Sequence, residues 1–186
     1  MMRTRAKDPV GRRNAIVEAA VAVIAEVGVH KVTHRRIANR ARVPLGSLTY
    51  YFARLDDILE AAFRSYVDTM VQAYNELLLT AASPDEAIDA LVQFLHLAAG
   101  SPTRTRLLFE LYSYAQHDDA TAVLVQDWMA STQVCLLKHF APETAAAVDA
   151  LVEGLLIRQT LQTQPIADAT VRASLAALTT VPPRHG

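Results

Sequence analysis

The sequence predicts an all-α protein of about nine helices, and three observations lead to this class. The chain contains 32 alanines against 6 glycines and 8 prolines, and alanine loses the least entropy on entering a helix. Apolar residues recur at helical spacing along most of the chain, and no stretch alternates as a strand would. With 186 residues, 52% of them hydrophobic, the chain can bury a substantial core, which excludes wholesale disorder.

The first three predicted helices follow one another closely. Apolar residues at helical spacing predict a helix over 12–27, and Gly28 follows where a left-handed cap is favoured. Thr33 can cap a second helix that ends at Ala41. Pro44 then marks a turn before a third helix over 45–52. The result is a longer helix followed by two short ones in tandem.

The later helices are delimited by caps and prolines. An unbroken helical period runs from Leu55 to Ala82, and Ser83-Pro84-Asp85-Glu86 is a capping box with proline at the first helical position. Gly100-Ser101-Pro102 ends one helix and caps the next, and Asp118-Asp119 caps another. The predicted helices are 55–82, 84–99, 102–116, 120–140, 142–164 before Pro165, and 168–180 before Val181-Pro182-Pro183.

Several classes of protein are excluded by composition. The single cysteine, Cys135, rules out an internal disulfide framework and a thiolate-rich metal site. The N-terminus has no apolar signal region, and no run approaches the roughly 18 apolar residues of a membrane span. We therefore expect a cytoplasmic bacterial protein with no membrane contact, no cofactor and no metal.

Charge is distributed unevenly along the chain. Residues 1–55 contain eleven lysines and arginines but three acids, a net charge of +8, whereas residues 56–186 carry seven basic and sixteen acidic residues, a net charge of −9. Separation of this kind suggests two roles, with the basic end as a candidate polyanion binder. The alternative is that the basic residues only solvate helical faces.

The two short helices have the composition of a DNA-reading motif. On a helical wheel, Ile37 and Ala38 face a small core with Leu48 and Phe52 of the next helix. The outward face of the first short helix is cationic, and that of the second carries small, hydrogen-bonding residues. A recognition helix in the major groove needs slim side chains surrounded by phosphate ligands. The alternative is a helical scaffold that never meets DNA.

The pattern Val32-Thr33-x-x-x-Ile37-Ala38-x-x-Ala41-x-Val43-x-x-Gly46-Ser47-Leu48-x-Tyr50-Tyr51-Phe52 resembles the N-terminal signature of the tetracycline-repressor (TetR) family. The resemblance extends over about residues 12–63. It implies an N-terminal helix-turn-helix domain, a helical ligand-binding domain, and a homodimer bound to double-stranded operator DNA.

The resemblance also assigns residues to DNA contact. Thr33 and Arg35 match phosphate or base contacts, and Gly46, Ser47 and Thr49 match base-reading positions. Three positions depart from the family pattern: Arg42 replaces a glycine and would carry strain if its φ is positive, Thr49 replaces a tyrosine, and Leu55 replaces a lysine for which Arg54 can substitute. The DNA-binding candidates are Thr33, His34, Arg35, Arg36, Arg42, Leu45, Gly46, Ser47, Thr49, Tyr50, Tyr51 and Arg54.

An aromatic stripe in the acidic part can wall a ligand cavity, as the resemblance implies. Ordinary core packing is the alternative for any single residue, because aromatic side chains at helical spacing are usually core. The mixed lining implies a small, largely apolar effector. The candidates are Phe63, Tyr66, Met70, Tyr74, Phe94, Leu97, Phe109, Tyr112, Gln116, Trp128 and Cys135.

The helix over 142–164 has two apolar stripes and therefore needs two partners. One stripe suits the domain core, and the other suits self-association together with the last helix. A fully internal helix is the alternative. The interface candidates are Ala147, Ala150, Gly154, Ile157, Leu161, Val171, Leu175 and Leu178.

We therefore expect a dimeric transcriptional regulator, most simply a repressor that binds a palindromic operator and is released by an effector. Residues 1–55 would bind DNA, and residues 56–186 would bind the ligand and dimerise. The alternatives are a DNA-binding factor of the same fold without an effector, and a helical enzyme. Catalysis has no support in the sequence, because no HExxH, CxxC or GxSxG spacing occurs.

Overall fold

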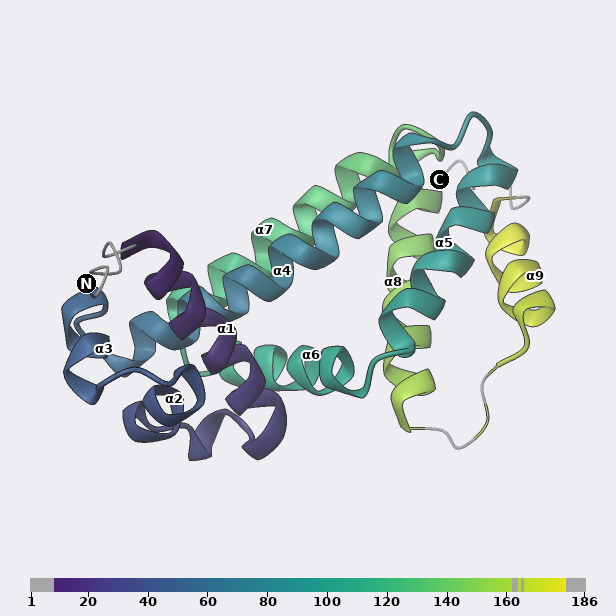
Figure 1. Ribbon diagram of the computed structural model, residues 1–186. Helices are drawn as coiled ribbons and strands as arrows, with labels where there is room; N and C mark the ends of the chain where they lie inside the picture. The colour runs from purple at the N-terminus through teal and green to yellow at the C-terminus, as the bar shows by residue number, and fades with distance from the viewer. Residues whose placement is uncertain (1–8, 162–163, 165, 180–186) are drawn as a thin grey trace, which may run out of the picture. The chain divides into compact units, whose positions relative to one another are not determined.

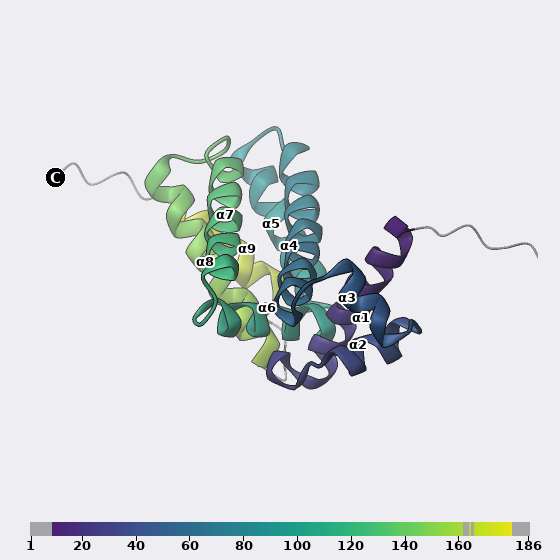
Figure 2. The same cartoon turned by 90° about the vertical axis from the view of Figure 1, so that its left-hand side faces the viewer.

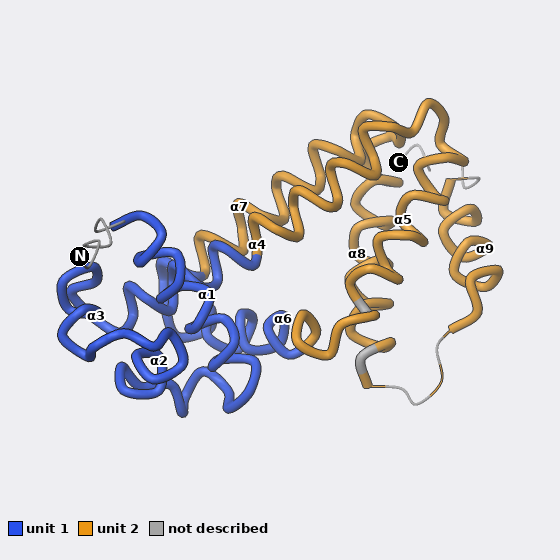
Figure 3. Tube along the Cα trace, in the orientation of Figure 1, with its two compact units in different colours: residues 1–66, 106–121 blue, residues 67–105, 122–186 orange. Residues whose placement is uncertain are grey.

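The computed structural model describes residues 9–161, 164 and 166–179. Over these residues the chain forms nine α-helices and one 3-10 turn, with no strand (Figure 1). This confirms the predicted all-α class. The chain folds as two compact units, one formed by Met1–Tyr66 with Arg106–Thr121 and the other by Val67–Thr105 with Ala122–Gly186 (Figure 3).

The first unit is built on a small apolar core shared by its short helices. It contains α1 (Pro9–Val27), the 3-10 turn η1 (Val29–Lys31), α2 (His34–Ala41), α3 (Leu45–Tyr51), the start of α4 (Leu55–Leu79) and most of α6 (Pro102–Ala115). Helix α1 packs on α2, and α2 packs on α3. The fully buried side chains of this core include Ile16, Ile24, Ile37, Leu48 and Ile58.

Helix α1 ends at a glycine whose backbone other residues rarely adopt. Gly28 has φ 81° and ψ 151°, so φ is positive as predicted, but ψ is extended rather than left-handed helical. A side chain here would also meet the Glu110 carboxylate, because an added Cβ would lie 3.2 Å from Oε1. This conformation turns the chain directly into η1, and only glycine populates it without strain.

The second unit contains the rest of α4, together with α5 (Pro84–Ala99), α7 (Asp119–Leu136, from Ala122), α8 (Pro142–Leu161) and α9 (Asp168–Thr179). Helix α5 packs on both α8 and α9, which also pack on each other. From Val67 onward α4 runs beside α7 (Figures 1 and 2). The Cys135 thiol of α7 donates to Asn75 Oδ1 of α4 at 2.8 Å.

Polar contacts hold α9 against α5. Arg172 Nε donates to Asp89 Oδ1 at 2.7 Å, and His96 Nε2 lies 2.7 Å from Asp168 Oδ1. Val171 and Leu175 of α9 are buried inside the unit. The apolar stripe of α9 is therefore used within the chain.

The predicted caps start the helices where expected. Ser83 Oγ accepts from Glu86 N at 3.2 Å, and the Glu86 carboxylate accepts from Ala82 N at 2.8 Å. Asp118 Oδ2 accepts from Thr121 N at 2.8 Å, which begins α7 at Asp119. Helix starts were readable because cap residues satisfy the free N–H groups of the first turn.

Helix ends differ more from prediction. Helices α4 and α7 end at Leu79 and Leu136, three and four residues before the predicted ends. Helix α8 is described as far as Leu161, and residues 162 and 163, which its predicted end would include, lie outside the described part of the chain. At the end of α4 the Thr80 hydroxyl donates to the Leu77 carbonyl at 2.9 Å, a local bond that competes with the helical ladder. The predicted stops at Pro165 and at 181–183 lie outside the described residues. No helix in the described part of the chain is long and apolar enough to cross a membrane.

Candidate functional site

The two short helices present the polar face that the sequence predicts. Ile37, Ala38, Leu48 and Phe52 are buried, which leaves the opposite faces of α2 and α3 toward solvent. Nine of the twelve candidate DNA-binding residues are exposed: Thr33, Arg35, Arg36, Arg42, Leu45, Gly46, Thr49, Tyr50 and Arg54. The remaining three are half-buried: His34, Ser47 and Tyr51.

Thr33 is the N-cap of α2. Its Oγ1 accepts from Arg36 N at 3.2 Å, and its backbone is extended, with φ −141° and ψ 151°. The cap leaves Arg35 and Arg36 in the first turn with their side chains exposed. A helix N-terminus flanked by arginines favours an anion such as a phosphate.

Arg42 terminates α2 in a left-handed conformation, with φ 55° and ψ 42°. Among the described residues it is the one non-glycine with positive φ. Its N–H bonds to the carbonyls of Ala38 and Asn39 and closes the last turn. The expected strain is therefore present, about 1–2 kcal/mol relative to a right-handed residue, and it places a guanidinium in the turn between the two helices.

The first turn of helix α3 carries small side chains that leave its backbone accessible. A Cβ added at Gly46 would meet nothing within 4 Å, and the Thr49 hydroxyl donates to the Gly46 carbonyl at 3.1 Å. At the C-terminal end, the rings of Tyr50 and Tyr51 pack edge to face, 4.9 Å apart. Tyr50 is 80% exposed. The first turn can thus approach base edges closely, while the aromatic pair stands at its border.

Three features near this face were not predicted. Arg40 Nη1 pairs with Glu26 Oε2 at 3.1 Å, so one arginine of α2 is neutralised by α1. An open pocket of about 320 Å³ lies beside this pair, lined by Val23, Glu26, Val27, Arg36, Asn39 and Arg40. The Arg13 guanidinium carbon stands 4.9 Å from the centre of the Phe52 ring, which brings a further cation next to the end of α3.

The candidate ligand residues divide between the two units. In the first unit Phe63 and Tyr66 are buried, Phe109 and Tyr112 are half-buried, and Gln116 is exposed. In the second unit Met70, Tyr74, Phe94, Trp128 and Cys135 are buried, whereas Leu97 is 41% exposed. The prediction that these residues wall one cavity stays a prediction.

Tyr74 is the most distinctive of the buried candidates. Its ring packs edge to face on Phe94, with centroids 4.9 Å apart, and its side chain is 2% exposed. Its buried hydroxyl has no hydrogen-bond partner among the described residues. Burial, and secondarily the nearby Asp149 carboxylate, raise the pKa of Tyr74 far above its usual value. A neutral buried phenol without a partner is a donor available to a ligand.

Asp149 of α8 lies within electrostatic range of this phenol. Burial and then the neighbouring Glu153 carboxylate raise the pKa of Asp149, while a hydrogen bond with Thr132 lowers it. The second unit therefore holds a half-buried acid within electrostatic range of an unsatisfied hydroxyl. The sequence signalled Tyr74 through its helical spacing but not Asp149.

Comparison with known proteins identifies the fold as one of DNA-binding regulators. The family model described as "Bacterial regulatory proteins, tetR family" matches residues 16–62, and "Tetracyclin repressor-like, C-terminal domain" matches residues 82–181. The chain belongs to the TetR family. It is accordingly a transcriptional regulator and not an enzyme, as predicted.

The TetR relatives span nearly the whole chain. The regulator BetI of Rhizobium meliloti is 29% identical over 174 residues, which cover 89% of this chain and 84% of that protein. The crystal structure of SCO7518 from Streptomyces coelicolor A3(2) is 40% identical with a TM-score of 0.84, covering 91% of this chain and 99% of that one. The multidrug binding protein EbrR in complex with malachite green is 28% identical with a TM-score of 0.79, with the same coverage of both chains.

The candidate interface residues of this TetR chain have unequal exposure. On α8, Ala147, Ala150, Gly154 and Leu161 are exposed, Leu161 by 75%, and Ile157 is half-buried. On α9, Leu178 is half-buried, whereas Val171 and Leu175 are buried in their own unit. Only the stripe on α8 is thus open along its length.

Proposed function

We propose that the chain is a ligand-responsive transcriptional repressor that binds a palindromic operator as a homodimer and is released by a small, largely apolar effector. The observation that carries the proposal is the exposed face of α2 and α3, where a cationic rim surrounds a first turn of slim side chains. DNA would be bound by residues 1–55, and the effector and second subunit by residues 56–186.

The exposed residues divide by chemistry into two roles on DNA. The hydroxyl, guanidinium and phenol groups at the rim would contact phosphates and set the register, and Gly46, Ser47 and Thr49 would face base edges. His34 and Leu45 would pack at the groove wall. The rim consists of Thr33, Arg35, Arg36, Arg42, Tyr50, Tyr51 and Arg54.

The proposed dimer is supported by the open stripe on α8. Small residues at 147, 150 and 154 permit close approach of a second helix, and Ile157 and Leu161 extend the stripe by two turns. A twofold arrangement would pair the same stripe on both subunits and would match an inverted-repeat operator. Because Val171 and Leu175 are buried within the chain, the proposal rests on α8 and not on them.

The proposed effector site is supported by the buried aromatic residues of the second unit and by the Tyr74 hydroxyl. A largely apolar, aromatic molecule with one hydrogen-bond acceptor would satisfy both features. Solved structures of the relative EbrR contain malachite green and, at 29% identity and a TM-score of 0.76, ethidium. Both are aromatic cations, and a positive charge on such a molecule would suit the half-buried Asp149.

The signal that releases the chain from DNA would be transmitted along α4, which belongs to both units. The helix starts at Leu55, directly after Arg54, and continues through Met70 and Tyr74. Any change of its orientation by a ligand at Tyr74 would move the start of the helix and, through it, the reading head. Linkage then requires that the operator weakens effector binding by the factor by which the effector weakens operator binding.

The test is selection of duplexes from a random pool by the purified chain, followed by titration of the selected duplex with and without ethidium. We expect an inverted repeat, binding by dimers, and reciprocal weakening between dye and duplex. Selection of no sequence would refute operator recognition. A selected duplex whose affinity no dye changes would instead favour a DNA-binding factor of the same fold without such an effector.

A matched pair of variants tests the dimer. Gly154→Glu places a charge in the open stripe of α8, whereas Glu143→Gln alters an exposed residue in the first turn of the same helix. The first variant should sediment as a monomer and lose the selected duplex, because a charge in an apolar contact has no partner. The second should behave as the parent. A parent chain that is monomeric at micromolar concentration would refute the dimer.

A further inference from the structure

One face of α6 contacts residues at the ends of three helical segments of the first unit. Arg106, Glu110 and Tyr114 are spaced by four residues, so their side chains lie on one side of the helix. Arg106 Nη1 donates to the Ala25 carbonyl at 3.3 Å, and Glu110 Oε2 accepts from Val29 N at 2.7 Å. The Tyr114 hydroxyl donates to Asp56 Oδ1 at 3.2 Å.

These contacts satisfy backbone groups that helix ends leave without partners. The Ala25 carbonyl lies in the last turn of α1, and Val29 N follows Gly28, whose φ is positive. Helix α6 thereby fixes the end of α1, while Tyr114 reaches the first turn of α4. Of the three, only Tyr114 touches a residue that also binds a DNA-binding candidate.

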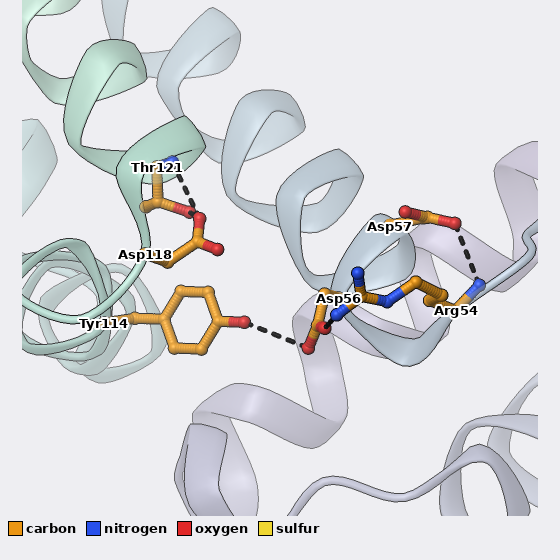
Figure 4. Close-up of polar contacts among 6 residues, drawn as sticks. All are labelled: Arg54, Asp56, Asp57, Tyr114, Asp118 and Thr121. Carbon is orange, nitrogen blue, oxygen red and sulfur yellow. Dashed lines mark hydrogen bonds and ion pairs between the residues drawn. The ribbon is translucent and has the colours of Figure 1, made fainter.

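That residue is Asp56, whose two oxygens have different partners (Figure 4). Oδ1 accepts from Tyr114, and Oδ2 accepts from Arg54 Nη2. The backbone of Arg54 is held separately, because its N–H donates to Asp57 Oδ2 at 2.8 Å. Burial, and then the Asp56 carboxylate, raise the pKa of Tyr114 to about 12, so the hydroxyl keeps its proton at neutral pH.

The division of the Asp56 oxygens limits its hold on Arg54. A guanidinium and a carboxylate form their strongest pair when both oxygens accept from the fork of donors. Each carboxylate oxygen can accept two hydrogen bonds, but the bond from Tyr114 fixes the rotation of the Asp56 carboxylate, and Arg54 meets it at Oδ2. The Arg54 side chain remains 73% exposed. The other donors of the guanidinium can then reach a phosphate.

We propose that Tyr114 is a positioning residue for DNA binding: its bond to Asp56 Oδ1 fixes the orientation in which the carboxylate meets Arg54 at one oxygen, and this keeps Arg54 available to the operator backbone. The inference rests on the proposed function, in which Arg54 contacts a phosphate. Without the Tyr114 hydroxyl, Asp56 turns both oxygens to Arg54 and withdraws it from DNA.

The experiment is a double-mutant cycle on the selected operator duplex, measured over a range of salt concentrations. Tyr114→Phe should weaken binding by about two- to fivefold per subunit, the range of an exposed charge pair. The slope of log affinity against log salt should become shallower by about 0.9 per subunit, which corresponds to one lost phosphate contact. In the Asp56→Asn background, Tyr114→Phe should change neither quantity, because the competing carboxylate is absent.

Glu110→Gln is the matched control, since it weakens the contact of α6 with Val29 and leaves Asp56 untouched. It should leave the salt slope unchanged. An effect of Tyr114→Phe that persists in the Asp56→Asn background, or an equal change of slope in Glu110→Gln, would show that α6 acts by general support and would overturn the proposal. If Arg54→Ala binds the selected duplex as the parent does, the positioning role is wrong while operator recognition stands.

Discussion

The left-handed backbone of Arg42 gives a prediction in which two variants differ in stability but lose the same DNA affinity. Its φ of 55° and ψ of 42° cost a residue with a side chain about 1–2 kcal/mol relative to glycine. Replacement by glycine removes this strain but raises the entropy of the unfolded chain, which costs about 0.4–1 kcal/mol. Arg42→Gly should therefore be more stable than Arg42→Ala by about 0.5–1 kcal/mol, because alanine keeps the strain.

The two variants separate backbone strain from charge, because both remove the guanidinium. Thermal unfolding should place Arg42→Gly about 1–4 °C above Arg42→Ala for a chain of this size. Both should lose the same affinity for the selected duplex, with the salt slope reduced by about 0.9 per subunit. Equal melting temperatures for the two variants would refute the strain, and an unchanged salt slope would refute the phosphate contact.

Three further predictions concern single side chains. Tyr74→Phe removes a buried hydroxyl without a partner, so it should stabilise the chain by about 1–3 kcal/mol in thermal unfolding and lower its affinity for the dye. A loss of stability would show that the hydroxyl has a hydrogen-bond partner. Burial raises the pKa of Asp149 above its usual value of 3.8, so the folded chain favours the protonated carboxyl. The contribution of this group to the free energy of unfolding is therefore complete below pH 3.8 and is lost as the pH rises through the raised pKa. Asp149→Asn should thus stabilise the chain at pH 7 and lose this advantage near pH 3, and denaturant melts at the two pH values that gave equal differences would contradict the assignment. On DNA, Arg35→Ala should weaken all duplexes alike, whereas Ser47→Ala should change base preference by about 1–3 kcal/mol at one position, as repeated selection would reveal.

Local chemistry made much of the fold predictable. The starts of α5 and α7 follow from Ser83 and Asp118, because a side-chain oxygen satisfies an N–H within the same turn. The strain at Arg42 was predictable because the residue stands where the family pattern has glycine. The ends of α4 and α7 were predicted too late, since their sequences contain no glycine or proline at the true end and the apolar period continues.

Contacts between distant segments were not predictable from the sequence. Glu110 and Val29 are 81 residues apart, and Tyr114 and Asp56 are 58 apart. No local pattern indicates that such pairs meet, because their meeting depends on the packing of whole helices. The same holds for Val171 and Leu175: their stripe was evident, but the choice between α5 and a second subunit as partner is made by tertiary structure.

The lone tryptophan and lone cysteine give this protein two natural reporters on a single helix. Trp128 and Cys135 are seven residues apart on α7, both buried in the second unit. Indole fluorescence therefore originates entirely from that unit, and a thiol reagent can react only when Cys135 becomes accessible through local opening. Far-ultraviolet circular dichroism records helices of both units, so a difference between its melting curve and that of the fluorescence would measure independent unfolding of the DNA-reading unit. A dye bound near the indole would quench its fluorescence by energy transfer. The same dye should slow thiol labelling if it stabilises the state in which Cys135 is buried.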